Sequence, residues 1–305
     1  MQKVISISLF VSWIFIHMAY GQHPQNEYPH IKGLSFGVGL QKTEHVITSF
    51  EQGSGTMNNI TQTDTATFLV TTLHYVSNGE PWFFKVGADF GFSGNAKAEY
   101  RGSSVVRDTT GTRSRRVSQN EDLDYDSGLL IGSVFKLGYN LNLGDSFRIR
   151  PVVGGKMDFN SFKLERSGFT GADGFTRASV SADYNYLWLG PTVGIDIDIA
   201  ITPQTVFYAG GEVFVAMIAD REISGSDSFG GGSYSTLSLD GSGLNIHFGF
   251  THVGKNGVGY FIKCYMRYWD ADGTQTSSTL FGPITGDYDW EAKAFGVTAG
   301  LGVSF

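Results

Sequence analysis

Three pairs of aspartates are the residues of this sequence whose type and spacing best suit acid–base chemistry. In each pair one residue separates the two carboxylates, and the pairs are Asp124/Asp126, Asp270/Asp272 and Asp287/Asp289. Paired carboxylates beside a histidine can activate water, and carboxylates alone can bind Ca²⁺ or Mg²⁺. His45, in the segment KTEH, is the histidine expected nearest to these pairs. Spacing does not establish general-base geometry, so we expect neither catalytic residues nor a metal site.

A run of arginines is the second feature that suggests chemistry. The segment RGSSVVRDTTGTRSRRVS carries Arg107, Arg113, Arg115 and Arg116 in a protein whose net charge is −7. Guanidinium groups pair well with phosphate and sulfate. This segment is therefore a candidate anion-binding loop for lipopolysaccharide or an anionic glycan, and the alternative is a solvated loop without a ligand.

The elements that must position these residues are strands, because apolar and polar residues alternate with a period of two along most of the chain. Leu129, Ile131, Phe135 and Leu137 share one parity, and glycines and polar residues occupy the other. Such segments recur at 33–50, 65–77, 82–101, 123–143, 146–166, 182–201, 205–224, 238–254, 258–275 and 290–305.

The connections between these segments alternate between short and long. Short links occur at 77–81, 144–145, 202–204 and 255–257, and polar stretches occur at 51–64, 102–122, 167–181, 225–237 and 276–289. Membrane barrels have short periplasmic turns, longer outer loops and an even number of strands. The predicted fold class is therefore all-β: a closed antiparallel transmembrane β-barrel of ten strands with five long extracellular loops.

A soluble β-sandwich is the alternative that also shows alternation. Its second face would meet water and carry charge, whereas here that face is mostly Gly, Ser, Thr and Asn, which suits a crowded lumen. Aromatic residues on the other face, such as Trp82 and Tyr139 near the short turns and Phe92 farther along, resemble interfacial girdles. These observations favour the membrane barrel.

The strand register predicts a charge network inside this barrel. Its members are Lys85, Asp89, Lys136, Arg148, Arg150, Lys156, Asp158, Asp196, Asp198, Glu212, Lys263 and Arg267, and Asp220 and His247 share the same parity. Both signs are present, and ten strands enclose little more than the side-chain-filled interior of an eight-stranded barrel. The network is predicted to be a structural plug, and the alternative is a narrow selective pore.

Two prolines conflict with an unbroken barrel. Pro151 and Pro191 fall inside predicted strands, and a closed sheet has no free edge where a missing N–H is harmless. We therefore expect a bulge or a local break beside each of them.

The N-terminus and the composition set the compartment. Residues 1–21 combine Lys3, an apolar run and small residues before Gln22, which predicts a secretory signal peptide. Residues 22–32 are then a periplasmic segment and 33–305 the barrel. One cysteine excludes a disulfide scaffold, and the negative net charge argues against nucleic-acid binding.

After its leader the chain resembles Gram-negative outer-membrane β-barrel proteins. The leader, the alternation and the terminal AFGVTAGLGVSF ending in Phe305 carry the resemblance. In that family the barrel-assembly machinery reads the C-terminal aromatic, so the resemblance implies this machinery as a partner through Phe305, in an outer membrane containing lipopolysaccharide.

The ten strands and tall outer walls are also similar to the omptin proteases, which implies an Asp/His dyad at the rim. That dyad is missing here, although His45 could approach Asp289 when the first and last strands pair. We therefore expect a non-enzymatic envelope protein without a cofactor, with a narrow porin-like channel and an omptin-like protease as alternatives.

Overall fold

The fold is a single antiparallel sheet that closes on itself. The computed structural model describes residues 31–305 except for 54–55, 80, 108–113, 145, 171–175, 228–231, 239, 280–281 and 305. The strands are β1 (Gly33–Gly53), β2 (Thr56–Gly79), β3 (Trp82–Ser93), β4 (Ala96–Arg107), β5 (Ser114–Tyr125), β6 (Ser127–Tyr139), β7 (Leu141–Asn142), β8 (Phe147–Thr170), β9 (Thr176–Thr202), β10 (Thr205–Ala216), β11 (Ile218–Asp227), β12 (Gly232–Ser238), β13 (Asp240–Val253), β14 (Val258–Thr279) and β15 (Gly282–Ser304).

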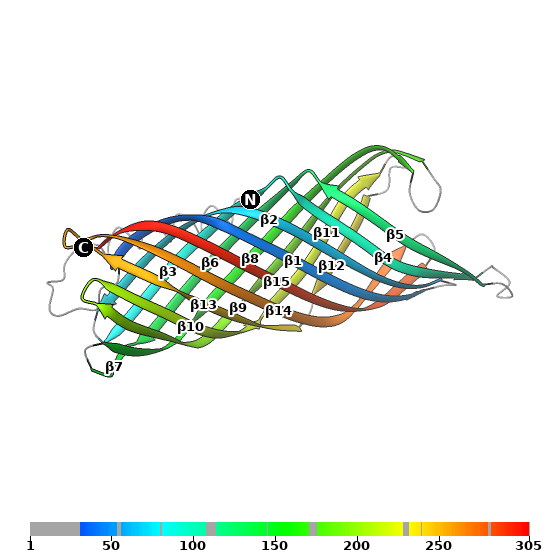
Figure 1. The fold of residues 1–305 in the computed structure, drawn as a ribbon. Helices are drawn as coiled ribbons and strands as arrows, with labels where there is room; N and C mark the ends of the chain where they lie inside the picture. The colour runs from blue at the N-terminus through cyan, green and yellow to red at the C-terminus, as the bar shows by residue number, and fades with distance from the viewer. Residues whose placement is uncertain are drawn as a thin grey trace.

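Closure joins the first strand to the last. β1 pairs with β15 from Gly33↔Ser304 to Gly53↔Ile284, and the strands tilt strongly around the barrel (Figure 1). The fifteen labelled strands form a ring of 10 strands, as predicted, because four strands of the ring are interrupted along their length and carry more than one label. These four are β3 with β4, β5 with β6 and β7, β10 with β11, and β12 with β13.

The polar stretches predicted as long loops are mostly strand. β1 and β2 remain paired to Gly53↔Thr56, and β4 and β5 remain paired to Arg107↔Ser114. These ladders extend past the apolar band as tall hairpins (Figure 1). Polar residues can continue an antiparallel ladder above a membrane because the outer face of such a sheet can meet water.

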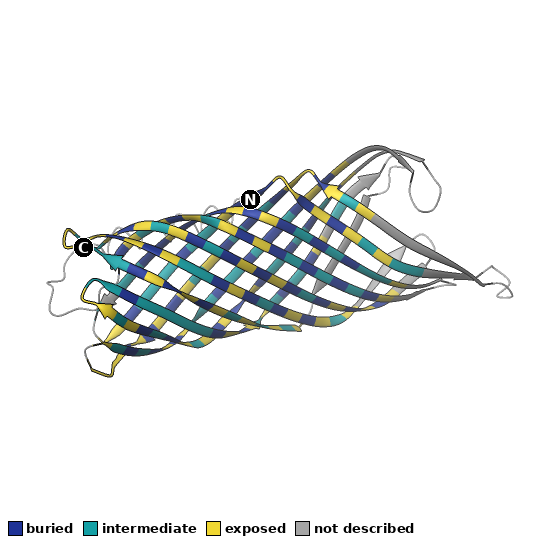
Figure 2. Ribbon diagram, viewed as in Figure 1, coloured by how far each residue is buried: buried dark blue, intermediate teal, exposed yellow. Residues whose placement is uncertain are grey.

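Burial alternates along the strands as the sequence predicts (Figure 2). On β1 the outward residues Leu34, Phe36, Val38 and Leu40 are exposed, and the next outward positions are Lys42 and Glu44. Exposed aliphatic and aromatic side chains on a closed barrel face hydrocarbon, so the change at Lys42 marks the outer limit of the apolar band. Among the described residues, no helix is long and apolar enough to span a membrane.

Each proline lies beside an interruption of the ladder, as predicted. The β8–β9 ladder runs through both Pro151 and Pro191, but the other neighbours of these strands are interrupted. Opposite Pro151, the partner strand stops at Tyr139, and Asn140 N donates instead to Pro81 O at 2.7 Å. Opposite Pro191, a bulge begins where β10 gives way to β11.

The bulge changes which side chains enter the barrel. Thr192 pairs with Phe214, and Leu189 pairs with Ile218. Gly190 and Pro191 on β9 therefore lie opposite the three residues 215–217. One extra residue reverses the parity of the rest of the strand, so Arg221 enters the lumen and Asp220 does not. The prediction that Asp220 points inward is wrong for this reason.

Inward glycines make room for larger neighbours. A Cβ on Gly210 would lie 2.2 Å from Asp196 Oδ1, and one on Gly296 would lie 2.2 Å from Tyr265 Cζ. Both approaches are closer than any real contact, so a larger residue at either position would displace the side chains that fill the barrel.

Candidate functional site: the filled lumen

The lower lumen, toward the short turns, contains the predicted charge network. Lys136 Nζ forms an ion pair with Glu212 and lies 3.9 Å from Asp196 Oδ1. Arg150 forms ion pairs with two aspartates: its Nη2 lies 2.6 Å from Asp198 Oδ2, and its Nη1 lies 3.8 Å from Asp196 Oδ2. These four strands, β6, β8, β9 and β10, are thereby connected through side chains as well as through the backbone.

A second group of charges spans the barrel just above the first. Arg267 Nη1 donates to Asp158 Oδ1 at 2.9 Å and Nη2 lies 3.3 Å from Asp89 Oδ2. Lys156 Nζ lies 2.9 Å from Asp158 Oδ2. His74 Nε2 is 3.4 Å from Asp89 Oδ1. The group joins β14, β8, β3 and β2 across the interior.

All twelve charged residues predicted for the lumen lie inside it. Nine are buried, and the other three, Lys85, Asp89 and Lys263, are half-buried. The strand pairings set the predicted neighbours together, because Arg148 pairs with Asp198 and Arg150 with Asp196 in the β8–β9 register. Arg148 Nε also donates to Asn142 Oδ1 at 2.8 Å.

An aromatic layer fills the barrel above the charges. Trp188, Trp290, Tyr186, Phe162 and Phe68 are fully buried. The rings of Trp188 and Trp290 lie 4.3 Å apart between centroids, and those of Phe162 and Tyr186 lie 5.9 Å apart. Aromatic side chains thereby occupy the interior of the barrel at this level.

A buried polar cluster interrupts the aromatic layer and was not predicted. Asp64 accepts hydrogen bonds from Tyr125 Oη at 2.9 Å, from Gln62 Nε2 at 2.8 Å and from Tyr186 Oη. Arg221 Nη2 donates to the side-chain oxygen Oε1 of Gln62. Burial raises the pKa of the Asp64 carboxyl group. The parity of Asp64 along the strand is that of an inward-facing residue. Asp64 comes one residue before the predicted strand at 65–77, and for that reason it was not among the predicted lumen residues.

His45 belongs to this cluster and does not face an aspartate pair. Its ring stacks on Tyr186 at 4.4 Å, and its Nδ1 accepts a hydrogen bond from Trp290 Nε1 at 3.3 Å. Burial, and then the positive charge of Arg221, lower the pKa of His45 to about 3. His45 is therefore neutral at physiological pH.

The expected approach of His45 to Asp289 does not occur. Across the β1–β15 seam Asp289 pairs with Thr48, whereas His45 pairs with Ala292. His45 is buried inside the barrel and Asp289 is exposed. Adjacent residues of a strand point to opposite faces, so an odd offset in register puts this pair on different sides of the wall.

The six aspartates of the three pairs are also exposed. Asp270 pairs with Glu291 and Asp272 with Asp289 on neighbouring strands. Partial burial, followed by the charges of Glu291, Asp272 and Asp289, raises the pKa of Asp270. Unlike a protease cleft, this arrangement offers the carboxylates to solvent on the outer wall.

One set of described residues has the geometry of a metal site. Single ligand atoms of Asp196, Glu212 and His247 lie within 4.8 Å of one another in the lower lumen. Lys136 already supplies a positive charge to both carboxylates, so a metal ion would have to displace an ammonium group. The arrangement therefore suits an ion-paired plug better than a metal centre.

The arginine segment is a hairpin rather than a loop. Arg107 lies on β4, and Arg115 and Arg116 lie on β5 opposite Val106 and Val105. The side chains of these three residues, and Arg113 as a whole, fall outside the described residues. Arg101, at the base of the same hairpin, has Nη1 2.6 Å from Asp122 Oδ1.

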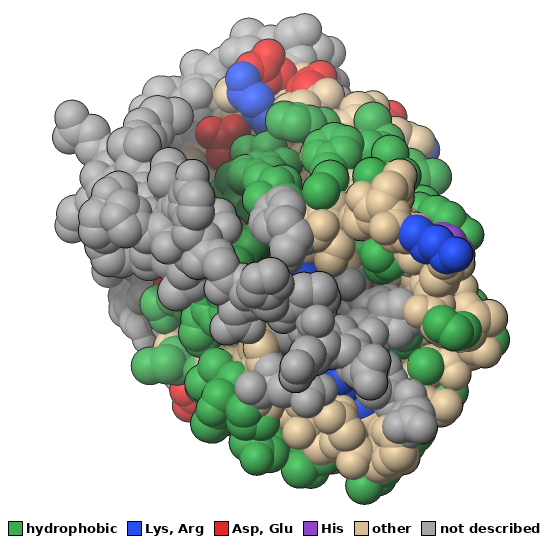
Figure 3. Space-filling view, turned by 90° about the vertical axis from the view of Figure 1, so that its left-hand side faces the viewer, with side chains coloured by type: hydrophobic (Ala, Val, Ile, Leu, Met, Phe, Trp, Pro, Cys, Tyr) green, Lys and Arg blue, Asp and Glu red, His purple; other side chains and the backbone are tan. Residues whose placement is uncertain are grey.

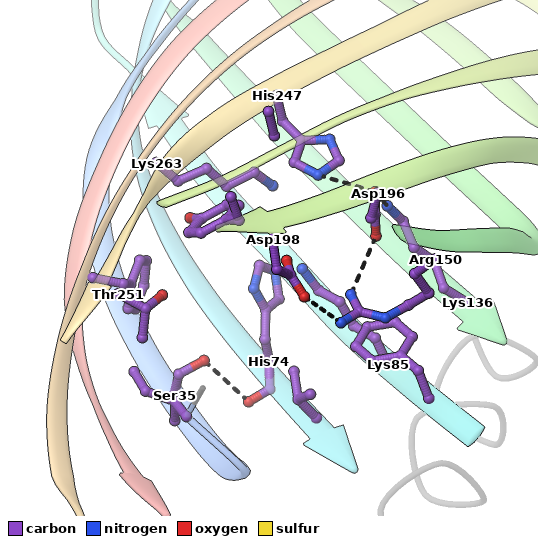
Figure 4. Close-up of a pocket in the computed structure, with 16 residues that line it drawn as sticks. Ser35, His74, Lys85, Lys136, Arg150, Asp196, Asp198, His247, Thr251 and Lys263 are labelled. Carbon is purple, nitrogen blue, oxygen red and sulfur yellow. Dashed lines mark hydrogen bonds and ion pairs between the residues drawn. The ribbon is translucent and has the colours of Figure 1, made fainter. Parts of the chain in front are cut away.

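A half-open chamber lies at the short-turn end of the lumen (Figure 4). Its lining includes Lys85, Lys136, Arg150, Asp198 and Lys263. Viewed from this end, hydrophobic side chains surround much of the visible rim (Figure 3). The predicted signal peptide (residues 1–21), residues 22–30 of the predicted periplasmic segment and the C-terminal Phe305 all lie outside the described residues.

Comparison with known proteins agrees with this architecture. The family model described as "Pom: Protochlamydia outer membrane protein" matches residues 47–305, which is most of the chain. No curated protein matches the chain.

Several solved structures resemble the chain. It is similar to the outer membrane protease OmpT from Escherichia coli, with 10% identity, a TM-score of 0.57, and 92% of this chain and 100% of that chain covered. It is also similar to OprG from Pseudomonas aeruginosa, with 11% identity, a TM-score of 0.32, and 90% and 99% covered. The Pseudomonas putida toluene transporter TodX has 12% identity, a TM-score of 0.33, and 92% of each chain covered. At such identities the likeness to OmpT shows the fold alone.

Proposed function

The chain belongs to the Pom family of outer-membrane proteins, and on that premise we propose that it is a non-conducting, non-enzymatic barrel that acts at the cell surface. The observation that carries the proposal is the filling of the lumen at two successive levels. Arg267 and Asp158 connect opposite parts of the wall in the charged level, and Trp188 and Trp290 pack together in the aromatic level.

The tall hairpins support a role outside the membrane. β4 and β5, and likewise β11 and β12, continue well beyond the residues that pair around the lower ring. Residues in such ribbons are accessible to large partners, whereas a plugged lumen is not. We propose lipopolysaccharide phosphates or an anionic glycan as the ligand of the β4–β5 hairpin, through Arg107, Arg113, Arg115 and Arg116.

Bilayer recording tests the proposal directly. Refolded full-length protein is expected to insert without stable conductance. A matched control replaces Lys136, Glu212, Trp188 and Trp290 together with serine, which removes side chains from both levels and should create conductance if the barrel inserts. Stable, ion-selective conductance of the unmodified protein would overturn the proposal.

A narrow porin-like channel is the second candidate, and the chamber at the short-turn end favours it. A half-open space lined by charged residues resembles the entrance of a pore whose continuation is closed by movable side chains. Conductance of the unmodified protein in the same bilayer recording, with selectivity changed by Lys136→Gln, would support this candidate over a permanent plug.

An omptin-like protease is the remaining alternative, and the exposed aspartates and buried His45 weigh against it. Incubation of purified protein with basic peptides is expected to leave them intact. Cleavage that His45→Ala abolishes would support protease activity, because contaminating proteases would not respond to that substitution.

A further inference from the structure

The chamber in the lower lumen is large enough for a small ligand. Its volume is about 110 Å³, and a single water needs roughly 10–15 Å³ of such space. The chamber can therefore hold several waters or one small hydrated ion. It lies in the interior of the barrel, against the charged level, and Lys85 and Lys263 extend into it from different strands (Figure 4).

The charges of the lower lumen do not balance. Among the described residues, seven cationic side chains and five carboxylates point into it. The cations are Lys85, Lys136, Arg148, Arg150, Lys156, Lys263 and Arg267, and the carboxylates are Asp89, Asp158, Asp196, Asp198 and Glu212. When all seven basic side chains are protonated and the histidines are neutral, this part of the barrel carries an excess of two positive charges.

The excess coincides with two particular lysines. Lys136, Arg150, Lys156 and Arg267 each lie within 4.0 Å of a carboxylate, and Arg148 pairs with Asp198 in register. For Lys85 and Lys263, the structure places no carboxylate of the described residues within this distance. Lys263 Nζ instead lies 5.2 Å from the centroid of the Tyr265 ring.

The position of Lys85 makes the unbalanced charge costly. Lys85 pairs directly with Lys136 on β6, and like charges opposite each other in a sheet destabilise it. An anion in the chamber would relieve this repulsion and would also face Lys263. The Thr251 hydroxyl group lines the same space and can donate a hydrogen bond, whereas the Ser35 hydroxyl group, also in the lining, donates to His74 O at 3.4 Å.

We propose that this chamber is a binding site for a small oxyanion of the phosphate type, held between Lys85 and Lys263. Lysine binds phosphate as a point charge, and both lysines are half-buried in the lumen. The ligand is a free ion rather than a lipid headgroup, because the chamber opens within the barrel and not through its lipid-facing wall. The site does not depend on whether the barrel conducts.

Calorimetric titration with inorganic phosphate tests the site. The refolded full-length protein in uncharged detergent is titrated at constant ionic strength, with chloride replaced by phosphate. Saturable binding with a Kd of about 1 mM or tighter is expected. Lys85→Gln and Lys263→Gln should each weaken it at least about tenfold, which is about 1.4 kcal/mol.

Two controls make the result decisive. Lys97→Gln removes an exposed lysine whose Nζ lies 3.6 Å from Asp124 Oδ1 outside the lumen, and it should bind like the unmodified protein. Lys85→Arg keeps the charge and should retain binding if Lys85→Gln fails to refold. The absence of saturable binding to the unmodified protein, or equal binding by Lys85→Gln and Lys263→Gln, would overturn the proposal. Binding only to micelles containing phosphatidylglycerol would overturn it too, since the source would then be lipid.

Discussion

Arg267 on β14 donates from Nη1 to Asp158 Oδ1 on β8 at 2.9 Å, although these strands are not neighbours in the sheet. Both side chains are buried. The contact therefore spans the lumen and joins two parts of the wall that the backbone ladder does not connect directly.

Loss of this contact should destabilise the barrel. Arg267→Met leaves Asp158 with Lys156 alone and removes the bond to Asp89, so we expect a loss of about 3 kcal/mol in the free energy of unfolding, measured by urea titration in detergent. Lys163→Met is the control, because its partner Glu165 is exposed and such surface pairs contribute less than about 1 kcal/mol. Equal effects of the two substitutions would contradict a structural role for the lumen pair.

Acid should destabilise the upper lumen through His45. Its pKa is lowered to about 3 in the folded protein, against an ordinary value of about 6.5. Between these values the unfolded chain binds more protons, so the contribution of neutral His45 is complete above pH 6.5 and is lost as the pH falls toward 3. The slope is about 1.4 kcal/mol per pH unit in that range.

The matched variant for this prediction is His45→Gln, which cannot titrate but can still accept the Trp290 hydrogen bond. Asp64, the cross-strand partner of His45, is present in both proteins and cancels in the difference. Urea titrations at pH 7 and pH 4.5 should show the unmodified protein losing about 2.5 kcal/mol more than the variant. Parallel losses would show that His45 does not control the acid response.

Removal of the bulge should prevent assembly. Deletion of Met217 restores an equal number of residues opposite Gly190 and Pro191, so Arg221 would point to the outer face and Asp64 would lose its nearby positive charge. We expect this deletion to abolish the heat-modifiable folded band in gel electrophoresis. Met217→Ser keeps the residue count and should assemble; assembly of both variants would refute a role of the bulge in setting parity.

The arginine hairpin should determine binding to lipopolysaccharide. Replacement of Arg107, Arg113, Arg115 and Arg116 by alanine is expected to weaken binding of purified lipopolysaccharide by more than tenfold in a surface-binding assay, because phosphate pairs strongly with guanidinium groups. Arg101→Ala, at a residue already paired with Asp122, is the control. Undiminished binding by the quadruple variant would contradict this proposal.

The C-terminal residue should matter for assembly in cells but not for stability. Phe305→Ser is expected to reduce the amount of folded barrel in the outer membrane several-fold, while refolding of the purified variant into detergent is unchanged. A defect in both experiments would indicate a structural role, and no defect in either would argue against recognition of Phe305 by the assembly machinery.

Much of the architecture can be predicted from local pattern. Alternation with a period of two identifies strands whichever strands they pair with, so the ten ring positions were predicted correctly, and the twelve charged residues assigned to the lumen by the same parity lie inside the barrel. The neighbours Arg150 and Asp196 could also be predicted, because antiparallel pairing of consecutive strands places the start of β8 beside the end of β9.

The features that local pattern missed depend on register and on distance along the chain. Arg221 enters the lumen because of a bulge opposite Pro191, and no residue near Arg221 indicates the change in parity. Asp64 and Tyr186 meet across the barrel although 122 residues separate them, and His45 and Asp289 fall on opposite faces through an odd register offset.

The sequence by itself therefore determined the strand count, the membrane-facing surface and the charge of the interior, since each depends on residues two positions apart. Only the tertiary structure decided that the lumen is filled, that the aspartate pairs face outward and that Lys85 and Lys263 are left without carboxylate partners among the described residues. The physical reason is closure: the curvature of the ring sets which inward side chains can reach across it, and no stretch of neighbouring residues contains that information.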